Sequence, residues 1–167
     1  ETGAPAFERF QVLEGRARIG QKLLFMCENS RLQVDLMMRS SELAGGSARV
    51  GLGILSMLAK RGRKIRIITN IGSDSVRLVE PYQTLIAFRH LDLTQKPVPR
   101  LSIIDDTEAL LGVGSNEDTE GRESEQVVLW ISSRSFIRSL RAYFNEIWRG
   151  ATPAPARLEA IKATKRA

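Results

Sequence analysis

Apolar residues recur along the chain with two spacings, and each spacing predicts a different element. Where they recur every three or four residues, the pattern is typical of an amphipathic helix. We expect helices at Arg16–Asn29, from Ser47 to Lys60, from Ser73 or Asp74 to just before Pro81, at Arg134–Arg149, and from Thr152–Pro153 onward. Gly62 ends the second of these helices, and proline is favoured in the first turn of the last.

Shorter stretches alternate between apolar and polar residues or are apolar throughout, which predicts strands. We expect strands at Leu32–Met38, Lys64–Thr69, Leu85–Phe88, Leu101–Ile104, Ala109–Leu111 and Gln126–Ile131. The fourth and fifth strands flank the turn Asp105–Glu108 and form a hairpin. Small and polar residues predict loops at Ser40–Gly46 and Glu117–Glu125. Strands that alternate with helices predict an α/β domain with a mixed β-sheet flanked by helices.

The composition excludes several classes of site. The chain has 167 residues, 43% of them hydrophobic, which fits one globular domain of ordinary size. Cys27 is the single cysteine and lies in an apolar run, so we expect a buried, unreactive thiol and no disulfide or multi-cysteine zinc site. His90 is the single histidine, which rules out a two-histidine metal site within one chain. We expect no metal and no cofactor, and no apolar run approaches the roughly 20 residues of a transmembrane segment.

The charge balance points toward an anionic partner. Lys and Arg number 25 against 19 acidic residues, a net charge of +6, and such a surplus favours nucleic acid or acidic surfaces. The candidates for a nucleic-acid interface are a stripe opposite the apolar face of one helix and a cluster at a strand entry: Arg134, Arg138, Arg141, Arg149, Lys60, Arg61, Arg63 and Lys64. Such groups are more often simply solvated surfaces. Arg66 alternates with Ile65 and Ile67, so we expect its side chain to leave the core face.

Two strand ends carry residues suited to a small anion. Phe88–Asp92 follows a strand, where clefts of α/β sheets form, and Arg89 and His90 are its anion-binding candidates. Thr69–Ser73 ends another strand and is expected to face the same cleft, with Ser73 offering an N–H group at a helix start. The alternative interpretation is that these residues pair with neighbours and cap the strand and helix ends.

Three segments make the order of elements recognisable. They are Arg61–Thr69, Phe88–Asp92, and Tyr143–Trp148 with the following Ala151-Thr152-Pro153 and Arg157. Together they resemble the phospholipase D-like sensor domain of archaeal sensor histidine kinases and of related archaeal transcription regulators that carry a winged helix. The likeness covers residues 7–161, and we expect residues 1–6 to be a disordered cloning scar and residues 162–167 a frayed tail. It implies a phospholipase D-like half, a homodimer and an attached output domain.

The phospholipase D superfamily has the signature His-x-Lys-x4-Asp, followed by Gly-Ser-x-Asn. Its histidine attacks phosphorus and its lysine neutralises the phosphoryl oxygens. At that spacing the signature falls on Pro99, Leu101 and Asp106, so only the aspartate is kept. Gly114-Ser115-Asn116 matches the second element in part. Asp92 stands where a lysine would follow His90, so that histidine does not restore the signature.

These observations predict a pseudo-enzyme: a non-catalytic sensory domain for signal transduction or transcription regulation. It would pass a ligand or assembly signal to its output domain, and the apolar faces of the last two helices would form the dimer surface. The ligand-binding candidates are Arg89, His90, Asp92, Asp106, Ser115, Asn116 and Ser73. The alternatives are a nucleic-acid-binding module and, third, a phosphodiesterase or nuclease. We expect a cytoplasmic location, or the sensor part of a membrane protein.

Overall fold

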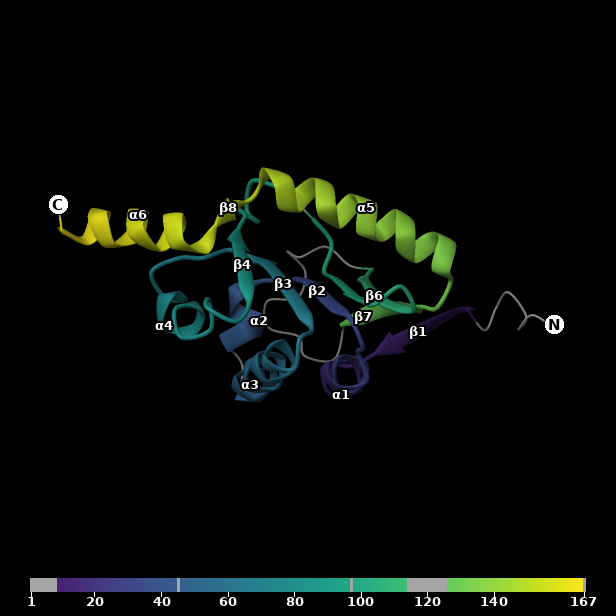
Figure 1. The fold of residues 1–167 in the computed structure, drawn as a ribbon. Coiled ribbons are helices and arrows are strands. Elements are labelled where there is room, and N and C mark those ends of the chain that lie inside the picture. The colour runs from purple at the N-terminus through teal and green to yellow at the C-terminus, as the bar shows by residue number, and fades with distance from the viewer. Residues whose placement is uncertain (1–8, 45, 97, 114–125, 167) are drawn as a thin grey trace.

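A mixed eight-stranded sheet lies between two layers of helices in the computed structural model, which describes residues 9–44, 46–96, 98–113 and 126–166 (Figure 1). The elements in chain order are β1 (Phe10–Glu14), α1 (Arg16–Glu28), β2 (Gln33–Met37), α2 (Ser40–Ala44), α3 (Gly46–Lys60), β3 (Lys64–Thr69), α4 (Val76–Val79), β4 (Ala87–His90), β5 (Leu101–Ile104), β6 (Glu108–Gly112), β7 (Val127–Ile131), α5 (Arg134–Gly150), β8 (Thr152–Pro153) and α6 (Ala154–Arg166).

The strand order is β1-β7-β6-β5-β2-β3-β4-β8. Strands β2, β3 and β4 run parallel to one another, and the other neighbours pair antiparallel. The sheet is mixed because βα connections join the parallel strands, whereas the β5–β6 hairpin needs only a tight turn.

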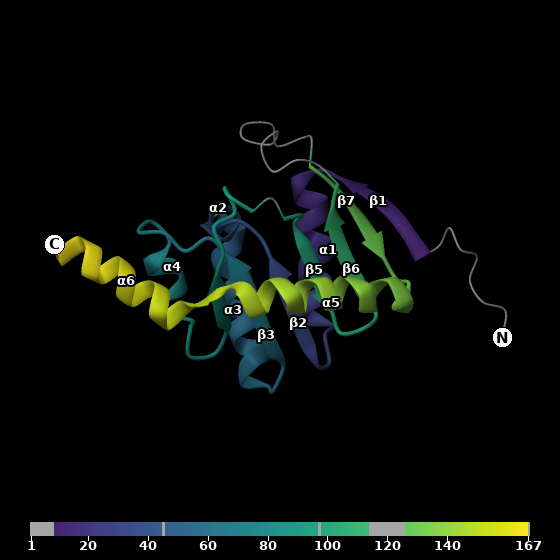
Figure 2. The same cartoon turned by 90° about the horizontal axis from the view of Figure 1, so that it is seen from above.

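Helices cover both faces of the sheet. Figures 1 and 2 show α1 and α3 on one face and α5 crossing the strands on the other, while α6 continues beyond the sheet beside α4. Each face has its own core. Leu36, Leu52 and Leu110 belong to the core on the α1 and α3 side. Ile103, Ile137 and Phe144 belong to the core under α5. The central strands are therefore buried on both sides.

Several sequence predictions are confirmed at the level of elements. The α/β class, the hairpin of β5 and β6, and the helices α1, α3 and α5 all fall within about two residues of their predicted bounds. Gly62 follows α3 with a φ of +90°, the left-handed conformation that favours glycine at a helix end. Cys27 is buried and free, and burial raises the pKa of its thiol to about 12.

Other predictions were wrong, each for a tertiary reason. The segment predicted as the loop Ser40–Gly46 begins with helix α2. The N–H of Ser40, the first residue of that helix, donates to Asn70 Oδ1 at 2.9 Å. Strand β1 was not predicted because it is exposed at the sheet edge and pairs with distant β7. The pair Thr152–Pro153 forms β8 against β4 instead of a first helical turn.

The remaining differences are shifts of boundaries. Strand β4 begins two residues later than predicted, at Ala87. Helix α6 continues to Arg166, through most of the segment expected to be a frayed tail. The predicted loop Glu117–Glu125 and the expected cloning scar lie outside the described residues, as do Ser115 and Asn116.

Candidate functional site

The parallel strands β2, β3 and β4 end at one edge of the sheet, which we call the carboxyl edge. Ligand sites of α/β sheets form at such an edge. The ends of β3 and β4, expected to share a cleft, lie side by side: Thr69 is paired with His90, and the Leu91 N–H donates to the Thr69 carbonyl at 3.0 Å. The candidate residues at this edge are therefore close in space, and their individual contacts decide what they do.

His90 holds the backbone that follows β3. Its Nδ1 accepts the N–H of Ile71 at 2.8 Å, while Arg157 of α6 donates from Nε to the Ile71 carbonyl at 2.9 Å. Burial lowers the pKa of His90, the positive charge of Arg157 lowers it further, and Asp92 opposes both. An imidazole that accepts at Nδ1 is neutral and carries its proton on Nε2. His90 thus fastens the end of β3, and only its Nε2 remains to serve a ligand.

Arg89 extends to the other face of the sheet, because successive side chains of a strand alternate. Its Nη1 donates to the Trp148 carbonyl at 2.7 Å, and its guanidinium lies 4.6 Å from the Trp148 ring centroid. A cation at the carboxyl end of a helix satisfies carbonyls that lack intrahelical partners and complements the helix dipole. Arg89 therefore caps α5, and it does not share a ligand position with His90.

Asp92 and Ser73 are exposed at the same edge. The Asp92 carboxylate accepts the N–H and the hydroxyl of Thr94, at 3.0 and 2.6 Å. These bonds, the hydroxyl first, lower the pKa of Asp92, and they are typical of a turn. Ser75, two residues after Ser73, bonds the turn before α4: its hydroxyl accepts the Gly72 N–H at 2.9 Å.

Asp106 lies at the opposite edge of the sheet, in the turn between β5 and β6, so the structure separates it from Arg89 and His90. Its side chain is 64% exposed and lies 3.6 Å from Arg141 Nε. The neighbouring Asp105 makes more hydrogen bonds than Asp106 does. Its carboxylate oxygens accept, at 2.8–2.9 Å, the backbone N–H groups of Arg31, Leu32 and Gln33. It adopts a φ of +51°, a conformation that Asp tolerates better than most residues.

Placing the signature aspartate on Asp105 moves the whole signature by one residue. The histidine and lysine positions then fall on Val98 and Arg100, in place of Pro99 and Leu101. Val98 is buried in the core under α5. Arg100 keeps a cation at the lysine position, and its Nη1 lies 2.6 Å from a carboxylate oxygen of α2. The spacing from Asp106 was the only register considered from the sequence, although Asp105 adjoins it.

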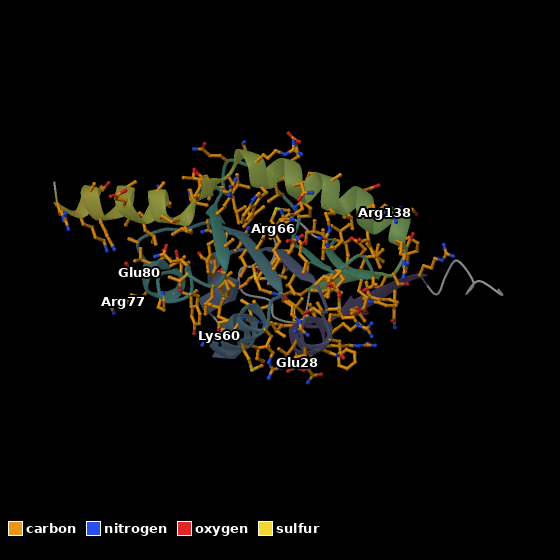
Figure 3. The ribbon with its side chains drawn as sticks, viewed as in Figure 1. Glu28, Lys60, Arg66, Arg77, Glu80 and Arg138 are labelled. Atoms are coloured by element: carbon orange, nitrogen blue, oxygen red, sulfur yellow. The ribbon has the colours of Figure 1, made fainter. Side chains whose placement is uncertain are left out.

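A buried charge cluster joins the sheet to α5. Asp35 is fully buried on β2, 2.7 and 2.8 Å from Nε and Nη2 of Arg66. Arg141 of α5 adds its Nη1 at 3.2 Å. Arg66 also donates to Asn145 Oδ1 at 2.9 Å, and its guanidinium lies 4.9 Å from the Phe144 ring centroid. Figure 3 shows Arg66 between the sheet and α5.

This cluster corrects two expectations. Arg66 does leave the face of Ile65 and Ile67, but the face it enters is itself covered by α5, so its side chain is buried. Arg141 was placed on the exposed stripe of its helix, and its side chain is only 17% exposed because it turns in to Asp35. A helix lying on a polar stretch of sheet contacts it through long side chains at the margin of its apolar face.

The remaining basic candidates fall into two separate groups. The exposed ones are Lys60, Arg61 and Lys64, from the end of α3 to the start of β3, and Arg134, Arg138 and Arg149 on α5. Arg63 is half-buried and donates to the Ser30 carbonyl at 3.2 Å. Figure 3 shows Lys60 and Arg138 on opposite layers of the molecule. The two groups therefore do not form one continuous basic surface.

The described part of the chain contains no group of three or more His, Cys, Asp or Glu side chains arranged to hold a metal ion. Within the same residues, no helix combines the length and the apolar character that crossing a membrane requires.

The comparisons with known proteins give structural likeness only. No family model and no curated protein matches the sequence. Among solved structures, TrmBL2, an archaeal chromatin protein with a novel mode of DNA binding, has a TM-score of 0.67 at 18% identity over 91% of this chain. This chain spans 55% of TrmBL2, about half its length.

Two further structures match nearly over their full length. Nuc from Salmonella typhimurium, a phospholipase D family member, has a TM-score of 0.66 at 16% identity over 86% of this chain and 97% of its own. NucT from Helicobacter pylori has a TM-score of 0.62 at 14% identity over 86% and 98%. Likeness at such identities shows the fold alone, and the fold of this chain is phospholipase D-like, with the mixed α/β sheet that the sequence predicts.

Proposed function

We propose that this chain is a non-catalytic regulatory domain of the phospholipase D-like fold, which passes a ligand or assembly signal to an attached output domain. The observation that carries the proposal is the position of the single histidine. His90 lies at the end of β4, where its Nδ1 accepts the Ile71 N–H. The segment before β5 offers Val98 or Pro99 at the nucleophile position of the signature, and neither side chain can attack phosphorus.

The contacts of Asp105 and Arg100 support the same proposal. Asp105 binds three backbone N–H groups, and Arg100 is paired with a carboxylate of α2. These interactions stabilise the scaffold and do not require a substrate. A domain that keeps such interactions without a histidine nucleophile is suited to binding and regulation.

The proposal includes an output domain and a homodimer. Its support is that a chain of this fold forms about half of TrmBL2, and that two copies are needed where catalytic relatives combine two halves. Light scattering of the purified chain over a range of concentrations tests the dimer. A single species of 18.6 kDa at the highest concentration would contradict it.

Hydrolysis of bis(p-nitrophenyl) phosphate tests the absence of catalysis. We expect the wild-type chain to give the rate of the buffer alone. His90→Asn is the matched control, because an asparagine Oδ1 can accept the Ile71 N–H without acting as a nucleophile. Turnover by the wild type that His90→Asn abolishes would overturn the proposal and favour the phosphodiesterase or nuclease alternative.

A nucleic-acid-binding module is the second candidate function, favoured by the likeness to a DNA-binding chromatin protein and by the exposed arginines of α5. It predicts that duplex DNA binds at 50 mM salt and is lost steeply as salt rises. Changing Arg134, Arg138 and Arg149 to Gln should then weaken binding, whereas changing Lys60, Arg61 and Lys64 should not, because the two groups lie on opposite layers. Absence of binding at 50 mM salt removes this alternative.

A further inference from the structure

We propose that the cavity between α1, α3 and the sheet is a binding site for a small amphipathic anion, a single aliphatic chain ending in a carboxylate. The cavity has a volume of about 620 Å³, within the range of about 300–1,000 Å³ that is usual for small-molecule sites. It lies on the face of the sheet opposite α5, and the candidates at the ends of β3 and β4 take no part in it. The inference goes beyond the proposed function and needs no output domain.

The interior of the cavity is apolar. Its floor is the face of the sheet formed by β2, β5, β6 and β7, and its walls are α1 and α3. The apolar lining includes Leu36, Leu110, Val128, Leu24, Leu52 and Leu55. Cys27 also lines it, and because burial raises the pKa of its thiol to about 12, that side chain stays neutral. Such a lining favours an aliphatic chain over a sugar or a nucleotide.

Two glycines leave room along the helical walls of the cavity. Gly20 on α1 and Gly51 on α3 both line it. A Cβ atom built at either position meets no other atom within 4 Å, apart from its own chain neighbours and helix backbone. Glycine is a poor helix former, so these two positions cost helix stability and add no side-chain volume to the walls.

One end of the cavity carries a charge imbalance. Arg100 and Glu42 both line it, with Nη1 and Oε1 2.6 Å apart and side chains only 21% and 26% exposed. Burial raises the pKa of Glu42, whereas the charges of Arg100 and Arg39 lower it. The charged residues that line the cavity are Arg16, Arg100 and Glu42, which leaves a surplus of one positive charge. A guanidinium carries five N–H donors, so Arg100 can hold a second carboxylate beside Glu42.

The other polar lining residues are compatible with this head-group position. Ser102 is buried next to Arg100 on the cavity side of β5. Arg16, Gln21 and Gln126 also line the cavity and are exposed or half-buried. A carboxylate at Arg100 is therefore within a partly buried polar end, while the aliphatic chain lies along the apolar walls.

The two tryptophans allow a direct test of where a ligand binds. Trp130 packs against the core on the cavity side of the sheet, and Trp148 packs under α5 on the opposite side. The probe is 11-bromoundecanoate, whose bromine quenches nearby indoles. In Trp148→Phe, we expect saturable quenching of Trp130 below the concentration at which the probe forms micelles. In Trp130→Phe, we expect Trp148 fluorescence to change by less than a fifth of that amount.

Two substitutions of glycine by leucine on α3 form a matched pair of variants, of which only one fills the cavity. Gly51→Leu should weaken binding at least tenfold, because its side chain enters the cavity. Gly53→Leu, on the same helix at an exposed position that does not line the cavity, should leave binding unchanged. If circular dichroism shows that Gly51→Leu does not fold, Gly20→Leu tests the same space from α1.

A separate experiment tests whether the carboxylate of the ligand lies at Arg100. Arg100→Gln should weaken binding of 11-bromoundecanoate at least tenfold and leave that of 11-bromoundecanol unchanged. The proposal is overturned by quenching that never saturates, by quenching that persists in the filled variants, by binding only to micelles or vesicles, or by equal affinity for the alcohol and the carboxylate in the wild type.

Discussion

Asp35 on β2 and Arg66 on β3 form a two-point ion pair inside the protein, with Nε–Oδ1 and Nη2–Oδ2 distances of 2.7 and 2.8 Å. The carboxylate is fully buried and the arginine nearly so. Arg66 continues to Asn145, and Arg141 reaches the same carboxylate, so α5 is attached to the sheet by charges as well as by apolar contacts. A planar guanidinium suits this role because its fork matches a carboxylate at two points.

Arg66→Met should therefore destabilise the fold strongly. Removing one partner of a buried ion pair leaves the other charge without compensation, which costs about 3–5 kcal/mol. We expect the low end, about 3 kcal/mol, because Arg141 still contacts Asp35. Urea denaturation measures the free energy of unfolding. Arg138→Met on the exposed face of α5 is the control and should change it by less than about 0.5 kcal/mol. Equal effects of the two substitutions would show that the pair contributes nothing.

The two neighbouring aspartates of the β5–β6 turn should differ sharply. Asp105→Ala removes the acceptor of three backbone N–H groups. Hydrogen bonds to a charged group contribute about 1.5–3 kcal/mol when buried, and since these are mostly exposed we expect a loss of about 2 kcal/mol in total. Asp106→Ala removes one 3.6 Å contact of an exposed side chain and should be close to neutral. The prediction fails if Asp106→Ala is the more harmful change in thermal unfolding.

The pKa of His90 should lie below 6.5, because burial and the charge of Arg157 disfavour its protonated form. The unfolded chain then binds a proton at a higher pH than the folded protein does. The stability that His90 contributes is present above pH 6.5 and is lost as pH falls through the lowered folded pKa. Since the chain has one histidine, its NMR titration needs no assignment. A folded pKa at or above 6.5 would contradict the argument.

Arg157→Gln tests the cause of that shift. Removing the positive charge should raise the pKa of His90, while burial still holds it below the ordinary value. The same substitution weakens the bond to the Ile71 carbonyl, so unfolding should be followed in parallel. His90→Asn should show less loss of stability between pH 7 and pH 5 than the wild type, since it keeps an acceptor that does not titrate. An unchanged pKa in Arg157→Gln would remove the electrostatic explanation.

Cys27 should resist thiol reagents in the native protein. Its side chain is 4% exposed, and a thiol with a pKa of about 12 carries almost no thiolate at pH 8. Reaction with a chromogenic disulfide should be far slower than that of the urea-unfolded chain, which reacts fully and provides the control. Native labelling at the rate of a free cysteine would mean that this residue of α1 is not buried.

Local pattern explains which parts of the fold could be predicted. The helix Arg134–Gly150 and the hairpin of β5 and β6 depend on periodicity and turn residues that neighbour each other in the chain. Strand β1 and helix α2 depend on partners far away: β7 for the first, and the Asn70 side chain for the second. Such partners leave little trace in local sequence.

The candidate site was predicted less completely. The sequence identified the adjoining strand ends at Thr69 and His90, and it left open whether Arg89 binds an anion or pairs with a neighbour. In the structure Arg89 bonds the Trp148 carbonyl of α5. Arg66 was expected only to leave the core face, and its side chain is buried under α5. The alternation of side chains along a strand predicts which residues share a face of the sheet. It does not predict whether a helix covers that face.

By itself the sequence determined the α/β class, the order of most elements, the absence of a disulfide within the chain, and the presence of a single histidine, His90. The tertiary structure decided which of two aspartates binds the backbone, which arginines are buried, and that a cavity lies between α1 and α3. These outcomes depend on contacts between residues 30 to 110 positions apart, such as Asp35 with Arg66 and Arg141. Only the folded arrangement of the layers fixes which side chains meet.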